Sequence, residues 1–256
     1  LGPTLAAIAA EKAGVLHGGA VAVSGPQEAE AAAVLQRQAD ALGCALRWVD
    51  PLPPEAAGGP CLGLAGALQR RNGAVAVAAA EALAARGWPI GEAAILQGLA
   101  SARWPGRLDR CRYGGRPLLL DGAHNPPAAA ALRLELDQEG RPRPVAGAAA
   151  APRRWLIGIQ RHKDAPELLQ ALLRPGDAVR VARLPEHSSW DAAELRGALP
   201  TEAVAIADAG ADLAQELDWL VRSPALPVAC GSLYLVAQLL PLLEPAAAAS
   251  SHGATD

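Results

Sequence analysis

Apolar and polar residues follow two different periods along the chain. In the stretch 27–42 the apolar side chains recur every three or four positions, which is the spacing of a helix face. Residues 20–23 instead form a short unbroken apolar run, which is typical of a buried strand. On this basis the first part of the chain is predicted to form helices over 5–14 and 27–42 and strands over 20–23 and 44–49. Helices that alternate with strands indicate a parallel α/β sheet.

The same alternation restarts at Pro117 and continues to residue 243. Strands are predicted over 117–121, 155–159, 178–183, 203–206 and 226–230, followed in turn by helices over 126–138, 165–173, 191–198, 210–221 and 232–243. Five such units are expected to build a doubly wound domain, in which helices cover both faces of a mostly parallel sheet.

Between these two blocks the pattern is broken by proline and glycine. Residues 51–62 are a Pro/Gly-rich connection, two helices are predicted over 71–86 and 91–102, and Trp104-Pro105-Gly106-Arg107 is interpreted as an interdomain hinge. We therefore expect domains over 1–106 and 107–244. Residues 140–151 are predicted to form a mobile loop, and residues 245–256 a disordered tail.

Composition narrows the class of protein. The chain has 256 residues and a net charge of −3, which gives no electrostatic case for nucleic acid or an anionic membrane as partner. Four cysteines without a CxxC pair argue against a zinc site or disulfide framework and favour the cytoplasm. The sequence contains no Met, and its first block carries only part of a sheet. We expect it to begin partway through a longer protein.

The most informative stretch for chemistry is Leu118-Leu119-Leu120-Asp121-Gly122-Ala123-His124-Asn125-Pro126-Pro127. An apolar strand ends at an acid, and Asn125 can cap a helix whose first position suits Pro126. This presents Asp121, His124 and Asn125 at the carboxyl end of a strand, where ligands bind in open α/β sheets. Asp, Gly and Asn also favour such turns for backbone reasons alone, so both interpretations stay open.

Common catalytic signatures are missing from the sequence. It has no GxxxxGK[ST] loop, no GxGxxG, no HExxH and no GxSxG. A complete nucleotide site therefore cannot be argued from glycine patterns.

Several short segments are nevertheless more specific in their order than any one alone. They are Ile8-Ala9-Ala10-Glu11-Lys12-Ala13-Gly14, Gln69-Arg70-Arg71-Asn72, Pro105-Gly106-Arg107, Leu120-Asp121-Gly122-Ala123-His124-Asn125-Pro126, Gly158-Ile159-Gln160-Arg161-His162-Lys163-Asp164 and Gly231-Ser232-Leu233-Tyr234. This series resembles the folylpolyglutamate synthase/dihydrofolate synthase family, relatives of the Mur ligases, from residue 1 to about residue 243. The resemblance implies the end of a P-loop ATPase-type parallel sheet followed by a Rossmann-like ligase domain.

The resemblance also implies an activity. Members of this family are ATP- and Mg²⁺-dependent ligases that add L-glutamate to folates or to dihydropteroate through an acyl phosphate. We expect a monomer without nucleic-acid or membrane partners. The sequence does not tell which of the two acceptors is used.

Residue by residue, the resemblance assigns nucleotide contacts to Asn72, Arg107, Asp121 and Asn125. It places His124 near the ligated groups, together with Asn125. Lys12 matches a lysine that is carbamylated in the family and that helps to hold a second Mg²⁺, an ion that prefers oxygen ligands.

Each of these residues also has a simpler interpretation. Lys12 could be a solvated helix lysine, Asn72 a polar residue at a helix N-terminus, and Arg107 a surface arginine. His124 and Asn125 could serve only to shape the turn. Lys163, Asp164 and Ser232 match the family as well, but no direct chemistry is predicted for them.

The sequence departs from the family pattern at three places. The P-loop, folate loop and upstream metal ligands of the family would precede Leu1, Leu68 stands where many members have histidine, and residues 51–66 are short. We therefore expect residues 1–256 alone to have no measurable ligase activity. The alternatives are a non-catalytic remnant that acts as a nucleotide-binding or assembly module, and a Mur-type peptidoglycan precursor ligase.

Overall fold

A computed structural model describes residues 4–138, 151–199 and 204–245. The chain forms two compact units, Leu1–Arg103 and Trp104–Asp256. In the described residues, no helix is long and apolar enough to cross a membrane.

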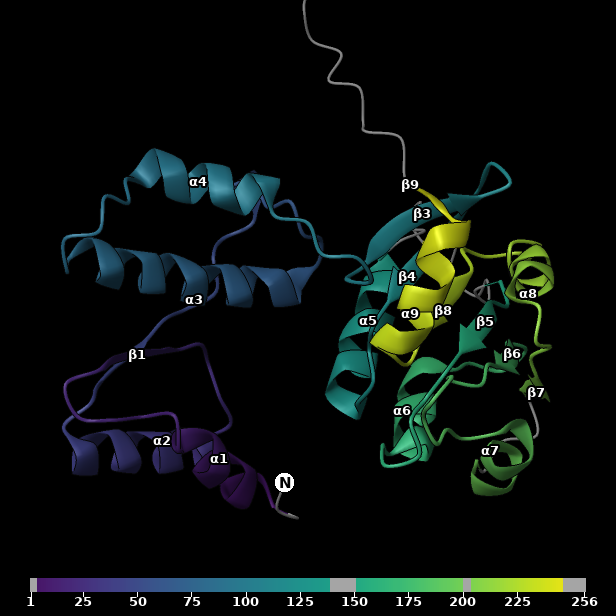
Figure 1. Ribbon diagram of the computed structural model, residues 1–256, viewed down its shortest axis with the longest axis horizontal. Coiled ribbons are helices and arrows are strands. Elements are labelled where there is room, and N and C mark those ends of the chain that lie inside the picture. Colours follow the sequence, from purple (N-terminus) through teal and green to yellow (C-terminus); the bar gives the residue numbers. More distant parts are fainter. Residues whose placement is uncertain (1–3, 139–150, 200–203, 246–256) are drawn as a thin grey trace, which may run out of the picture. The chain divides into compact units, whose positions relative to one another are not determined.

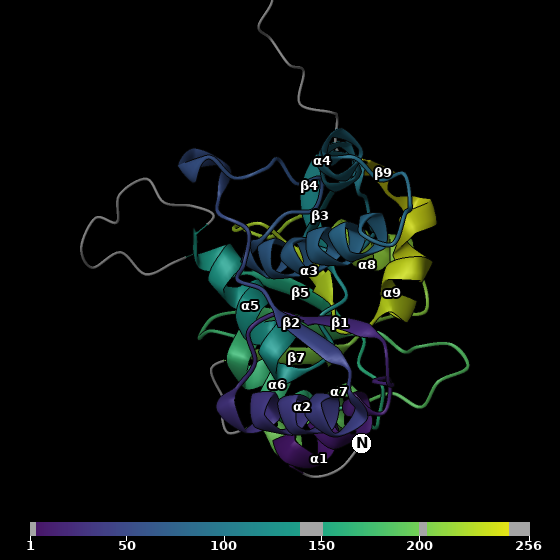
Figure 2. The same ribbon diagram turned by 90° about the vertical axis from the view of Figure 1, so that its left-hand side faces the viewer.

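The N-terminal unit contains a small parallel sheet with helices on both sides. Strand β1 (Val21–Ser24) pairs with β2 (Ala45–Trp48), and this sheet lies between α2 (Ala29–Leu42) and α3 (Ala67–Ala84) (Figures 1 and 2). The remaining elements are α1 (Leu5–Ala13), a 3-10 turn η1 (Glu55–Ala57) and α4 (Glu92–Ser101). Helix α1 begins where predicted, because the Thr4 hydroxyl accepts a hydrogen bond of 3.1 Å from the Ala7 N–H. The predicted parallel α/β pattern is confirmed.

One predicted helix start in this unit is wrong. Helix α3 begins at Ala67 and not at residue 71. Gly66, with φ of 97°, ends the preceding irregular segment, and the residues after it are good helix formers. Asn72 therefore lies one turn inside the helix instead of at its N-terminus.

The C-terminal unit is built on a seven-stranded sheet with the order β7-β6-β5-β8-β4-β3-β9 (Figure 1). Its elements are β3 (Asp109–Tyr113), β4 (Arg116–Asp121), α5 (Pro126–Gln138), β5 (Arg154–Ile157), α6 (Ala165–Leu172), β6 (Ala178–Val181), α7 (Ala192–Ala198), β7 (Ala205–Asp208), α8 (Leu213–Leu220), β8 (Val228–Cys230), α9 (Leu233–Leu239), η2 (Leu240–Leu242) and β9 (Glu244–Pro245). The strands β4, β8, β5, β6 and β7 run parallel, and β3 and β9 add an antiparallel edge. All five predicted strand–helix units are present.

Alternate side chains of each buried strand face opposite sides of this sheet. Leu119 packs with α5, α6 and α7 in one core, whereas Leu118 and Leu120 pack with α8 and α9 in the other. All three leucines are at most 1% exposed. This double burial explains why the strands are continuous apolar runs. Because β4, β8 and β5 are neighbouring parallel strands, the turns that follow them all lie at the carboxyl ends of the strands.

The hairpin of β3 and β4 was not predicted. Polar residues dominate β3, which hides its strand period, but Gly114 and Gly115 both have positive φ, 53° and 73°. They form the two-residue turn between Tyr113 and Arg116, and Gly-Gly at this place is a known hairpin signal.

The end of the chain also differs from the prediction. Helix α9 ends at Leu239, where the chain tightens into η2 around Pro241. Pro245, the first residue of the predicted tail, belongs to β9. The rest of that tail, and the predicted mobile loop except for residue 151, lie outside the described residues.

Thiol reactivity offers a direct check of this burial pattern. Cys44, Cys111 and Cys230 are buried and Cys61 is exposed. Burial, reinforced by the nearby Asp109 carboxylate, raises the pKa of Cys111 to about 11, so its reactive thiolate is scarce at neutral pH. We expect Ellman's reagent to modify one thiol rapidly in the native protein and four in denaturant. Cys61→Ser should remove the fast phase; two or more fast thiols would contradict the fold.

Candidate functional site

The turn between β4 and α5 is held by its own polar side chains. Asn125 accepts a hydrogen bond of 2.9 Å from the Ala128 N–H through its side-chain oxygen, and α5 starts at Pro126. The predicted cap is therefore confirmed, and the cap fixes the direction in which the turn leaves the sheet.

Asp121 lies under this turn and is only 8% exposed. Its Oδ1 accepts a hydrogen bond from the Ala123 N–H and its Oδ2 one from the Leu108 N–H, each at 2.8 Å. Burial raises the pKa of Asp121, and these two hydrogen bonds together with the charges of Arg107 and His124 oppose the shift. The carboxylate thus joins the turn to the segment before β3.

His124 is half-buried on the same turn, and one of its ring nitrogens makes a hydrogen bond within the turn. Nδ1 lies 2.8 Å from the Gly122 carbonyl oxygen. A carbonyl can only accept, so Nδ1 must carry the hydrogen in this contact. In the neutral ring, Nε2 is therefore the nitrogen that can accept a proton.

Arg107 lies beside Asp121, on the segment that Asp121 holds. Its side chain is half-buried, and within the described residues its guanidinium has no hydrogen bond or ion pair. A planar guanidinium with all its donors available is suited to bind carboxylate or phosphate oxygens in a bidentate way. The structure thus brings together four predicted site residues: Arg107, Asp121, His124 and Asn125.

The turns after neighbouring strands have mainly structural contacts. After β8, the Ser232 hydroxyl accepts a hydrogen bond of 3.0 Å from the Tyr234 N–H and caps α9. After β5, Asp164 accepts one of 3.1 Å from the Glu167 N–H and caps α6. Both side chains therefore serve as helix caps in this structure.

A contact that the sequence did not reveal fixes the turn carrying Lys163. The Trp190 indole N–H donates a hydrogen bond of 3.2 Å to the Lys163 carbonyl, and the Trp190 backbone N–H donates one of 3.0 Å to Ile159. The Arg161 guanidinium packs over the Trp190 ring at 5.2 Å. No local sequence signal could have paired these positions, because the two turns are joined only in three dimensions.

The other two predicted residues belong to the N-terminal unit, on separate helices. Lys12 is exposed in the last turn of α1. Asn72 donates a hydrogen bond of 3.1 Å from its side-chain amide to that of Gln69. Both amides line an otherwise apolar pocket of about 150 Å³, whose other lining residues are Leu62, Leu64, Gly73, Ala76, Leu99 and Ala102. This pocket is smaller than the ~300–1,000 Å³ of typical ligand sites, so it suits part of a nucleotide, such as its base, rather than a whole nucleotide.

Metal ligands do not gather in the described residues, which contain no group of three or more His, Cys, Asp or Glu side chains able to hold an ion.

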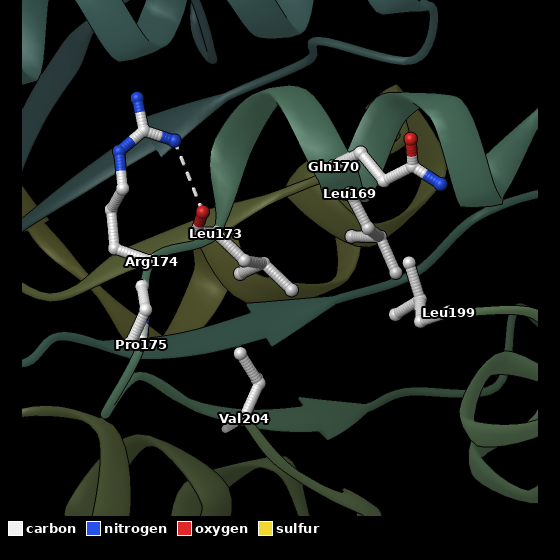
Figure 3. Close-up of a pocket in the computed structure, with 7 residues that line it drawn as sticks. All are labelled: Leu169, Gln170, Leu173, Arg174, Pro175, Leu199 and Val204. Atoms are coloured by element: carbon white, nitrogen blue, oxygen red, sulfur yellow. Dashed lines mark hydrogen bonds between the residues drawn. The ribbon is translucent and has the colours of Figure 1, made fainter. Parts of the chain in front are cut away.

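A second cavity, of about 230 Å³, lies at the opposite end of the strands of the C-terminal sheet from the turn after β4 (Figure 3). Its walls come from the end of α6, Leu199 after α7, and the residues leading into β6 and β7, which are the amino ends of these strands. Figure 3 shows the Arg174 guanidinium turned back to the Leu173 carbonyl, a hydrogen bond of 3.0 Å. This largely apolar cavity is separate from the turn that carries Asp121 and His124.

Comparisons with known proteins show what the chain is similar to. A family model described as "Dihydrofolate synthetase, C-terminal domain" matches residues 108–242. The chain is similar to the dihydrofolate synthetase of Saccharomyces cerevisiae, with 31% identity over 277 aligned residues that cover 94% of this chain and 61% of the yeast protein.

Two solved structures share the fold. Folylpolyglutamate synthase of Mycobacterium tuberculosis complexed with ADP matches with a TM-score of 0.73 and 24% identity, over 94% of this chain and 60% of that one. A bifunctional folylpolyglutamate synthase/dihydrofolate synthase of Yersinia pestis, complexed with AMPPNP and Mn ion, matches with a TM-score of 0.70 and 25% identity, over 94% and 57%. The chain thus spans about three fifths of the length of these relatives.

Proposed function

Because the chain belongs to the folylpolyglutamate synthase/dihydrofolate synthase family, we propose that it acts in an ATP-dependent ligase that joins L-glutamate to a folate or to dihydropteroate. The observation that carries this proposal is the turn Asp121–Asn125, which lies inside the matched residues 108–242, together with the Arg107 guanidinium just before them. We further propose that residues 1–106 belong to the ATPase domain of such an enzyme and residues 107–244 to its ligase domain.

The reaction requires an activated carboxylate. ATP donates its γ-phosphoryl group to the acceptor carboxylate, the glutamate amine then displaces phosphate, and the products are ADP, phosphate and an amide. In this proposal Arg107 binds phosphate oxygens through its guanidinium. Asn72, with its pocket, binds the base, and Asp121 and Asn125 complete the nucleotide contacts. The relatives solved with ADP or with AMPPNP support a nucleotide as substrate.

His124 is proposed to handle the proton of the incoming amine. At neutral pH the amino group of glutamate is protonated and cannot attack until it loses that proton. With Nδ1–H given to Gly122, the Nε2 atom of His124 is the acceptor that faces away from the turn's backbone contact. This role follows the usual logic of a positioned general base.

Lys12 is proposed to carry a carbamate. Its exposed position in the last turn of α1 leaves the amine accessible to carbon dioxide. A carbamate would supply oxygen ligands for Mg²⁺, which the described side chains do not provide as a group. The Mn ion bound by the Yersinia relative supports a divalent cation in the reaction.

We also propose a cytoplasmic monomer. Four cysteines without a disulfide among them suit a reducing compartment, and ATP is available there.

The experiment that tests the function is a ligase assay. The protein is expressed from its gene with whatever coding sequence precedes Leu1, and separately as residues 1–256. Each is given ATP, Mg²⁺, L-glutamate, and either dihydropteroate or a reduced folate. We expect ADP, phosphate and a glutamylated product in equal amounts from the former and none from the latter. No product from any form would favour the non-catalytic remnant. Product from residues 1–256 alone would contradict our expectation and show that these residues suffice for the reaction.

A further inference from the structure

The backbone around Arg107 is held in an unusual conformation. Leu108 has φ of 46°, in the left-handed region that side chains with a Cβ rarely adopt. Gly106, two residues earlier, has φ of 72°. Arg107 is therefore carried between two left-handed positions, and the direction of its side chain depends on both of them.

A charged side chain from another strand holds this conformation. The Asp121 Oδ2 atom accepts the Leu108 N–H at 2.8 Å, across 13 residues of sequence. The Gly122 N–H donates a second hydrogen bond of 2.7 Å to the Gly106 carbonyl. Asp109 adds a weaker local contact, since its carboxylate accepts the Gly106 N–H at 3.2 Å. Both long-range contacts come from the single turn after β4.

Close packing leaves the segment little freedom. A Cβ added to Gly106 would lie 2.8 Å from Val236, and one added to Gly122 would lie 2.5 Å from Leu233. The two glycine backbones thus approach α9 closely, which fixes the segment against the sheet. Within the described residues the Arg107 guanidinium makes no hydrogen bond, so its direction depends on the backbone that carries it and on the attraction of the nearby Asp121 carboxylate.

From these contacts we infer that Asp121 is a positioning residue for Arg107: by anchoring the left-handed Leu108, it aims the Arg107 guanidinium at the substrate phosphate. This inference rests on the proposed function and adds a task to Asp121 beyond any contact with the nucleotide. In this task Asp121 acts through the backbone, so the part of its effect that passes through Arg107 must disappear when Arg107 is already missing.

The test uses the active protein expressed from its gene. Asp121→Asn keeps the shape of the side chain but turns one acceptor into a donor, which opposes a backbone N–H. We expect about a 100-fold loss of kcat/KM for ATP, the scale expected for a displaced group, with KM for glutamate less affected. In Arg107→Ala, the same substitution should cost clearly less than in the unmodified protein, because the two residues act through one shared path. Exchange of the Leu108 amide, measured by NMR, should become faster in Asp121→Asn.

A second-site rescue separates positioning from direct contact. Glycine adopts positive φ freely, so Leu108→Gly should restore part of the activity of Asp121→Asn. Leu108→Ala removes the same packing but keeps a Cβ, and it should not restore activity. Asp212→Asn makes the same exchange of a carboxylate for an amide at another residue that accepts two backbone N–H groups, and it should leave activity unchanged.

The outcomes distinguish this inference from the proposed function. Additive losses in the Arg107 and Asp121 variants, an unchanged Leu108 exchange rate, or no rescue by glycine would overturn the positioning role while leaving the ligase intact. Absence of ATP-dependent turnover in the unmodified protein would overturn the ligase itself.

Discussion

Replacing Asp177 by alanine is expected to lower the free energy of unfolding by about 3–5 kcal/mol, a large share of the stability of a typical domain. Asp177 is 3% exposed, and its carboxylate accepts three hydrogen bonds. The donors are the Arg153 N–H at 2.8 Å, the Trp155 indole N–H at 2.9 Å and the Arg174 N–H at 3.0 Å. Alanine would leave all three without this acceptor, and two of them belong to the buried Arg153 and Trp155, where water cannot easily replace it. Urea denaturation, followed by circular dichroism, measures the change.

Two matched substitutions show whether the loss of stability in Asp177→Ala comes from leaving buried donors without an acceptor. Asp177→Asn retains one acceptor oxygen and should lose about 1–3 kcal/mol. Asp212→Ala removes an exposed carboxylate that caps α8 by accepting the Ala214 N–H at 2.9 Å, and it should cost about 1 kcal/mol. If Asp177→Ala lowers the free energy of unfolding by less than Asp212→Ala does, the hydrogen bonds of Asp177 contribute little to stability.

The fold was predictable from sequence where burial sets the residue pattern. Strands such as β4 and β8 are covered on both faces, so they appear as continuous apolar runs between helices of period 3.6. The β3 strand was missed because it lies near the edge of the sheet, where Arg110 and Arg112 are exposed and only Cys111 and Tyr113 turn inward, so its alternation is short and weakly apolar. Gly114-Gly115 is the stronger signal for the hairpin.

The site was predictable as a set of residues but not as a set of contacts. The order of motifs selected Arg107, Asp121, His124 and Asn125, and the structure gathers these four on one turn and the segment beside it. The tether from Asp121 to Leu108 could not be foreseen. It depends on a leucine with positive φ, which sequence preferences argue against.

Position within an element was a further source of error. Asn72 was placed at a helix N-terminus, where a polar side chain would need no ligand to explain it. Because α3 starts at Ala67, Asn72 instead pairs with Gln69 beside a pocket. This hydrogen bond leaves the Asn72 side-chain oxygen and the Gln69 side-chain amino group available to a ligand, whereas a helix cap would give Asn72 a purely structural role.

The largest expected effect on activity is that of His124→Asn. If Nε2 takes the proton from the glutamate amine, kcat should fall about 10²–10⁴-fold at saturating substrates. Asparagine can still donate to the Gly122 carbonyl, as Nδ1 of His124 does at 2.8 Å, so the turn should keep its shape. His17→Asn is a matched control, because His17 makes a similar contact of 3.3 Å to the Gly18 carbonyl in an exposed loop. That variant should retain full activity and the same unfolding midpoint.

Hydroxylamine tests whether proton removal is the step that His124→Asn impairs. This small amine is neutral at pH 7 and attacks acyl phosphates without the help of a base, so it can replace glutamate as the nucleophile. The rate of hydroxamate formation should then be nearly equal in the unmodified protein and in His124→Asn, although their rates with glutamate differ widely. If both nucleophiles slow to the same degree, His124 is needed to form the acyl phosphate or to keep the site in shape. If neither slows, Nε2 has no part in the reaction, and the role of His124 is confined to its hydrogen bond with Gly122.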